Sequence, residues 1–117
     1  MEIKKDLLRK KMKNIEFSKV VSLKDEVTYR EGEVVSKTLA QNNYVSITLF
    51  AFGDGEEISS HKSDGDAFVT CLDGEGKVII DGIEYFLKEG ESVVMPAGHP
   101  HSVHGISKFK MLLVVVF

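Results

Sequence analysis

Short segments with the period of a β-strand, separated by glycine or Asp-Gly, limit the fold of this chain most tightly. Residues 45–52 (VSITLFAF) alternate two sets of side chains with a two-residue period. Asp81-Gly82 lies between the apolar residues VII and IEYF, which is a strong signal for a tight hairpin. Further strands are expected at residues 67–72, 77–80, 92–95 and 109–117. The pattern predicts an all-β domain, and periodicity alone leaves a sandwich and a barrel both open.

The last expected strand, FKMLLVVVF, is apolar on both faces from Met111 onward. Such a strand has to be covered on both sides. In an antiparallel protein of this size a second copy of the chain would supply one cover. We therefore expect a homodimer.

Composition excludes several classes of partner. The chain has 117 residues, which predicts one domain, and a net charge of −3, so no basic surface for nucleic acid is expected. The longest apolar run, residues 111–117, is too short to cross a membrane. Cys71 is the only cysteine and residues 1–13 contain no secretory signal, so a reducing, cytoplasmic location is expected.

The first 16 residues form a basic segment that differs from the domain expected over residues 17–117. Its apolar residues recur at roughly helical spacing, which predicts a short amphipathic helix over residues 2–14, with an extended segment as the alternative. We expect this segment to pack its apolar side on the domain as a flap. A membrane-surface element is the alternative. The apolar residues are Ile3, Leu7, Leu8, Met12 and Ile15.

The four histidines fall into two short stretches, with His61 in one and His99, His101 and His104 in the other. Imidazole is the commonest side-chain ligand of metals and titrates near neutral pH. Two histidine-bearing stretches, each flanked by glycine, predict a single site that is assembled from two strands.

The second stretch resembles the second conserved motif of the cupin superfamily. The matching residues are Gly90, Pro96, Gly98 and His101, with Pro100 also usual there and Gly105 in place of a final asparagine. The first cupin motif is matched by Gly55, His61 and the closing Gly74. Within it, Ser63 stands where a second histidine is usual, and Ala67 or Phe68 where a glutamate is usual. The resemblance covers about residues 40–117.

This resemblance implies a double-stranded β-helix, the jelly-roll barrel of the cupins, with a pocket inside. It places His61 and His101 in that pocket on adjacent strands. Cupins usually hold iron, manganese, nickel or zinc with three histidines and one glutamate, and this chain keeps two of those four ligands. Two imidazoles alone make a poor site for such metals, so we expect either no metal or a weakly held divalent one.

Asp66 is the tentative third ligand. It lies one residue short of the usual glutamate, so strand alternation turns it to the other face unless a bend at Gly65 re-aims it. His61, His101 and Asp66 would then form the two-histidine, one-carboxylate set of non-haem iron oxygenases. Asp64 is a weaker candidate.

The sequence supports less specific predictions for three other residues. His99 is expected at the pocket mouth, and His104 on the face opposite His101. Cys71 shares its parity with Ala67 and Val69, so it faces either the pocket or the core, where a cysteine acts as a small hydrophobe.

The sequence thus leaves three functions. The first is a stand-alone cupin module that binds a small acidic or aromatic molecule, with His61 and His101 hydrogen-bonded to its carboxylate or hydroxyl. The alternative is a metal-dependent cupin enzyme, a dioxygenase or an isomerase. The third is a sensor whose basic N-terminal segment contacts a partner.

Overall fold

The computed structural model describes residues 11–117, which form seven β-strands and one short 3-10 helix, Leu23–Asp25. The first three strands are β1 (Val34–Gln41), β2 (Val45–Phe52) and β3 (Glu57–His61). They are followed by β4 (Asp66–Ile80), β5 (Ile83–Lys88), β6 (Ser92–Met95) and β7 (His101–Val116). All strand pairs are antiparallel.

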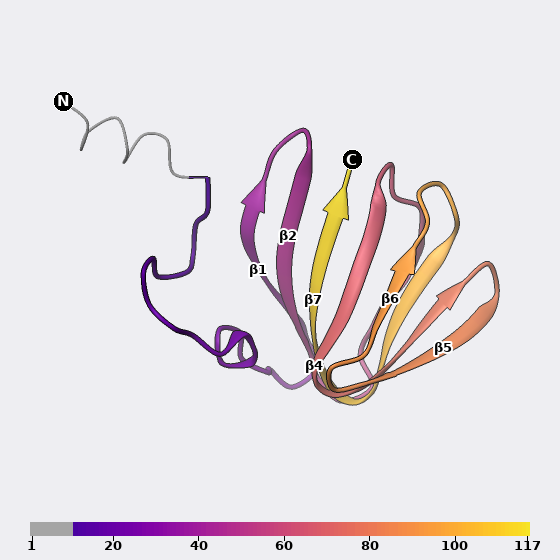
Figure 1. Cartoon of the computed structure of the whole chain (residues 1–117). Coiled ribbons are helices and arrows are strands. Elements are labelled where there is room, and N and C mark those ends of the chain that lie inside the picture. Colours follow the sequence, from indigo (N-terminus) through magenta and orange to yellow (C-terminus); the bar gives the residue numbers. More distant parts are fainter. Residues whose placement is uncertain (1–10) are drawn as a thin grey trace.

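The two long strands β4 and β7 pair with each other along most of their length and run through both layers of the fold. Their first layer is completed by β2 and β1 on one side and β6 on the other. Their second layer is completed by β3 and β5. Figure 1 shows the two layers opening from the corner where β4 and β7 bend. This arrangement confirms the expected double-stranded β-helix.

Local patterns located several elements correctly. Strands β2 and β6 have the expected bounds, and Asp81 and Gly82 form the expected hairpin turn, both with positive φ (51° and 80°). The separation of residues 67–72 from 77–80 was wrong, because β4 continues through Asp73-Gly74 as one strand. The chain bends there through two irregularities in its pairing with β7 instead of ending the strand.

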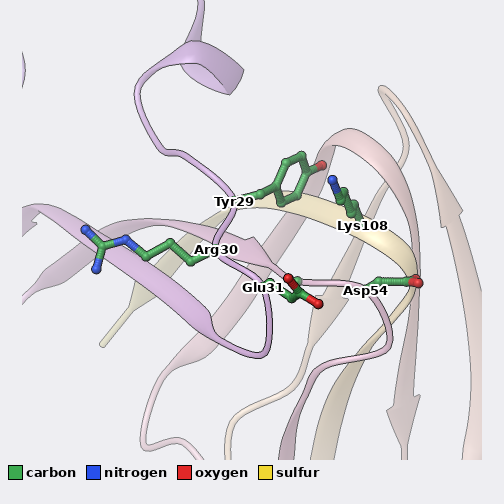
Figure 2. Close-up of a pocket in the computed structure, with 6 residues that line it drawn as sticks. Tyr29, Arg30, Glu31, Asp54 and Lys108 are labelled. Atoms are coloured by element: carbon green, nitrogen blue, oxygen red, sulfur yellow. The ribbon is translucent and has the colours of Figure 1, made fainter.

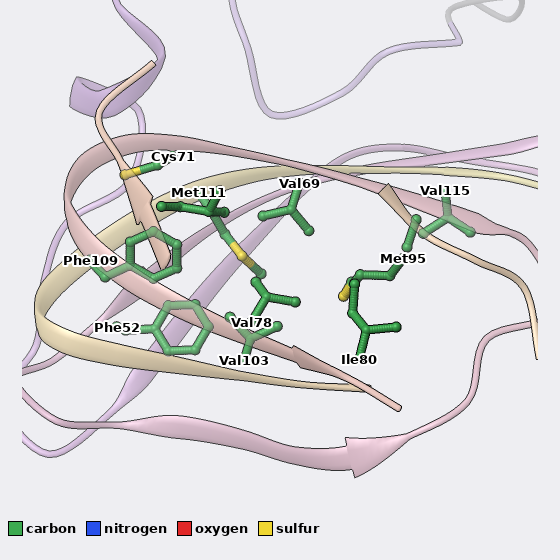
Figure 3. Packing of buried hydrophobic residues seen from close by; sticks show 12 residues of the cluster. Phe52, Val69, Cys71, Val78, Ile80, Met95, Val103, Phe109, Met111 and Val115 are labelled. Atoms are coloured by element: carbon green, nitrogen blue, oxygen red, sulfur yellow. The ribbon is translucent and has the colours of Figure 1, made fainter. Parts of the chain in front are cut away.

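The main core lies between the two layers. Phe52 and Phe109 pack with ring centroids 5.3 Å apart at the closed corner, next to Val78 and Val103 (Figure 3). A side chain at Gly76 would lie 2.5 Å from the Phe109 ring, so only glycine leaves room for the ring at this corner. The strands therefore meet closely at this end, and toward the other end the barrel contains a cavity.

A second apolar cluster lies outside the first layer. Leu49 and Leu112 pack there against Met12, Ile15 and other residues of the segment that precedes β1. This segment therefore covers part of the second face of β7, for which a partner subunit had been expected. Residues 11–14 are not helical, and the rest of the expected helix over residues 2–14 lies outside the described residues. Within residues 11–117, no helix is long and apolar enough to span a membrane.

Candidate functional site

The two motif histidines meet at one place in the barrel. His61 ends β3 and His101 begins β7, and the two residues are direct partners in the pairing of these strands. Their rings lie edge to face with centroids 4.5 Å apart. His101 is buried at 2% exposure, whereas His61 is exposed. His101 therefore lies inside the barrel and His61 at its mouth.

Both rings line a cavity of about 250 Å³, which we call the histidine cavity. Apart from these rings and Ser63, its described walls are apolar, and none of the residues that line it carries a fixed charge. A small cavity with an apolar body and few polar groups is typical of a ligand site. The apolar residues are Phe50, Ile58, Ala67, Met95, Val103, Met111, Leu113 and Val115.

Backbone carbonyl groups determine the tautomer of both rings. Nδ1 of His61 lies 3.0 Å from the carbonyl oxygen of Ser59, and Nδ1 of His101 lies 3.0 Å from that of His99. A carbonyl oxygen only accepts hydrogen bonds, so each Nδ1 must carry the proton. In the neutral form each Nε2 is then a hydrogen-bond acceptor.

Burial keeps His101 neutral. Removal from water lowers the pKa of His101 below its ordinary value of 6.5, and the nearby His61 lowers it further. The hydrogen bond to the His99 carbonyl group raises this pKa, but by less than burial lowers it. At neutral pH His101 thus presents a lone pair.

Asp66 does not join the histidine pair. Its Oδ1 accepts a hydrogen bond from the backbone N–H of Ala97 at 2.8 Å, and the side chain is exposed beside the turn that follows β6. Gly65 permits a close approach instead of re-aiming the carboxylate, since a Cβ there would lie 2.4 Å from the carbonyl oxygen of Val116. The next residue, Ala67, is the one that lines the histidine cavity.

The donor set of the histidine cavity bears on the metal that the family resemblance implies. Within residues 11–117, no group of three or more His, Cys, Asp or Glu side chains is arranged to hold a metal ion. The histidine cavity offers two imidazoles and the hydroxyl of Ser63, which is a weak donor. This set does not fit a tightly held transition metal, which usually takes at least three protein ligands.

The remaining histidines lie outside the histidine cavity. Nδ1 of His99 is 2.5 Å from Oδ2 of Asp81 and holds the turn between β4 and β5. His104 lies between Glu57, at 2.6 Å from its Nδ1, and Ser102, at 2.9 Å from its Nε2. Neither ring lines the cavity, and both have protein partners.

Cys71 lies in the main core and not in the walls of the histidine cavity. Its Sγ donates to the carbonyl oxygens of Asp73 and Gly74, at 3.6 and 3.4 Å. Burial raises the pKa of Cys71 from 9.0 to about 11, so the thiol stays protonated at neutral pH. The sulfur therefore packs as a small apolar group.

Sequence reasoning did not find a second cavity, of about 350 Å³, between the N-terminal segment and the corner of the sheet (Figure 2). The Tyr29 hydroxyl donates to Oδ2 of Asp73 at 2.8 Å, and Nζ of Lys110 lies 4.8 Å from the centre of the Tyr29 ring. These contacts anchor the segment to the sheet. Acidic and basic side chains balance in the walls, where Arg30 points away from Lys108, so no ligand charge is favoured.

Comparisons with known proteins agree on the fold. The family model of the cupin domain matches residues 48–117. A solved protein of unknown function from Streptococcus pyogenes is 43% identical over 92% of this chain and 94% of that chain, with a TM-score of 0.89. A cupin superfamily protein from Desulfitobacterium hafniense is 32% identical over 91% and 97% of the two chains, with a TM-score of 0.86. A curated uncharacterized protein from Aquifex aeolicus is 26% identical over 82% of this chain and 81% of its own.

Proposed function

This chain belongs to the cupin family, and on that premise we propose that its barrel binds a small organic molecule in the histidine cavity. The observation that carries the proposal is the wall of that cavity, which is apolar except for His61, Ser63 and His101. Apolar walls bind the body of a ligand, and a few polar groups orient it. Nε2 of His101, and Nε2 of His61 in its neutral form, offer hydrogen-bond acceptors for this purpose.

A fragment screen observed by NMR tests the proposal. Fragments that bind should shift the resonances of the His61 and His101 rings. The variant Ala67→Leu adds a larger side chain to the cavity wall and should abolish these shifts. Phe68→Leu is the matched control, because Phe68 is the next residue and its side chain is 42% exposed on the opposite face of β4.

Two results would count against the proposal. One is a screen in which no fragment shifts the two histidine resonances at millimolar concentration. The other is fragment binding that Ala67→Leu leaves intact, since the ligand would then lie elsewhere. If Ala67→Leu does not fold, Leu113→Phe fills the same cavity from the partly buried end of β7.

A metal-dependent cupin enzyme, a dioxygenase or an isomerase, is the second candidate. It is favoured by the two Nδ1 hydrogen bonds to carbonyl groups, which orient an imidazole as they do in metal sites. The presence of only two imidazoles and one hydroxyl in the histidine cavity argues against a metal-dependent enzyme. Elemental analysis of wild type and His101→Ala decides between them: about one equivalent of iron, manganese, nickel or zinc, lost in the variant, would support the enzyme.

A further inference from the structure

We infer that the ligand of the histidine cavity is a small neutral alcohol or phenol whose hydroxyl donates a hydrogen bond to His61 or His101. The inference rests on the proposed function and narrows its ligand class. Four features of the cavity carry it: the tautomer of the rings, the lack of charge in the walls, the hydroxyl of Ser63 and the size of the space.

The tautomer selects a donor. Both Nδ1–H groups are already used by the carbonyl oxygens of Ser59 and His99, so only Nε2 of each ring remains for a ligand. The described residues contain no buried side-chain nitrogen without a hydrogen-bond partner, so Nε2 of His101, which has none, must be reachable from the cavity. A lone pair at Nε2 attracts an O–H group and repels a carboxylate oxygen.

The walls select a neutral molecule. No lysine or arginine side chain lines the histidine cavity to offset a carboxylate, and no aspartate or glutamate lines it to offset an ammonium group. An unpaired charge in an apolar site costs free energy on the order of the whole binding energy of a small ligand. A ligand with an ionised group would have to leave that group in solvent at the His61 end.

Ser63 selects a hydroxyl over other donors. Its Oγ accepts a hydrogen bond from the backbone N–H of Gly65 at 3.2 Å, which leaves its own O–H group free to donate. A ligand hydroxyl is both a donor and an acceptor. It can therefore donate to an imidazole and accept from Ser63 in the same cavity.

The volume limits the body of the ligand. Drug-sized ligands occupy pockets of roughly 300 Å³ or more, and an apolar cavity of about 150 Å³ takes up benzene. The histidine cavity, at about 250 Å³, lies between these limits. A single ring with one or two substituents fits this range.

Three probes of nearly equal shape test the ligand class: 4-methylphenol, 4-methylbenzoate and toluene, titrated by NMR at about pH 7.5, where the phenol is neutral. We expect the phenol to bind about tenfold more tightly than toluene, the effect of one hydrogen bond. The carboxylate should bind more weakly than the phenol by more than tenfold. Nitrogen chemical shifts of the imidazoles should place the proton on Nδ1 of both rings.

The outcomes separate the two proposals. Tighter binding of 4-methylbenzoate than of the phenol would overturn the ligand class and leave the proposed function standing. Equal binding of the phenol and toluene would overturn the role of the hydroxyl. Failure of all three probes to shift the cavity resonances would overturn both proposals for a ligand of this size.

Variants assign the hydrogen bond to the rings. His101→Leu or His61→Leu should remove most of the preference for the phenol over toluene. His61 is exposed, so its variant is expected to fold even if the buried His101 cannot be replaced. His104→Leu is the matched control, since that ring lies outside the cavity between Glu57 and Ser102, and it should keep the preference. A preference that survives both cavity variants would overturn the inference.

Discussion

His61 and His101 are direct partners across β3 and β7, and their rings meet edge to face with centroids 4.5 Å apart. Each ring is held by a backbone carbonyl group two residues earlier in the chain, Ser59 for His61 and His99 for His101. Strand pairing thus brings the two rings together, and local hydrogen bonds set the tautomer of each neutral ring. The result is two hydrogen-bond acceptors in one apolar cavity, with His101 inside it and His61 at its mouth.

The lowered pKa of His101 makes stability depend on pH. In the unfolded chain His101 takes up a proton near its ordinary pKa of 6.5, at a higher pH than in the folded protein. The free energy of unfolding should therefore fall as the pH drops through about 6.5, and this loss should stop growing below the folded pKa. Urea unfolding between about pH 7.5 and pH 5 measures it.

The variant His101→Gln should show a smaller fall in stability over this range than wild type. Met95→Leu is the control, because it changes the same cavity without changing a titrating group. It should keep the wild-type dependence on pH. The same pH dependence in His101→Gln and wild type would show that burial of His101 has no such effect.

Gly76→Ala should destabilise the closed corner of the barrel. The new Cβ would lie 2.5 to 2.7 Å from three atoms of the Phe109 ring, which is itself fully buried. Overpacking of this kind costs about 1–3 kcal/mol of unfolding free energy. Chemical denaturation measures the loss, and a smaller loss in a Phe109→Leu background would assign it to the ring. An equal loss in both backgrounds would place its cause elsewhere.

Cys71 should react slowly with thiol reagents in the folded protein. Burial raises its pKa from 9.0 to about 11, so the reactive thiolate is scarce at pH 8, and burial blocks access as well. Labelling with a disulfide reagent, with and without urea, measures the difference. Equally fast labelling in both conditions would contradict the buried position.

Dimerisation remains a prediction, and the structure defines a surface for it. A row of apolar side chains crosses the outer face of the first layer, where strand pairing places Val114 between Ile47 and Phe68, and Phe68 beside Val94. Phe68 and Val94 are 42% and 50% exposed. The same patch on a second copy would cover this row around a two-fold axis.

We therefore expect wild type to have twice the mass of one chain in sedimentation, and Phe68→Glu to be monomeric. Phe86→Glu is the matched control on β5, away from the row, with Phe86 58% exposed. It should remain dimeric. A monomeric wild type at micromolar concentration would remove the prediction.

The sequence by itself determined the features that depend on neighbouring residues. Alternation along β2, the proline after β6 and the Asp81-Gly82 turn each act within a few residues, so the bounds of β2 and β6 and the hairpin could be predicted. The resemblance of the residues around His101 to the second cupin motif implied the barrel. The meeting of His61 with His101 followed from that barrel.

Only the tertiary structure decided which contacts form between segments that are far apart in the chain. In the folded protein the Asp66 carboxylate accepts a hydrogen bond from the backbone N–H of Ala97. Pairing with β7 keeps β4 extended through Asp73-Gly74. The tertiary structure also packs Met12 and Ile15 on the outer face of the first layer. These outcomes depend on contacts between residues far apart in the chain, whose free energies exceed the local preferences that a sequence pattern records.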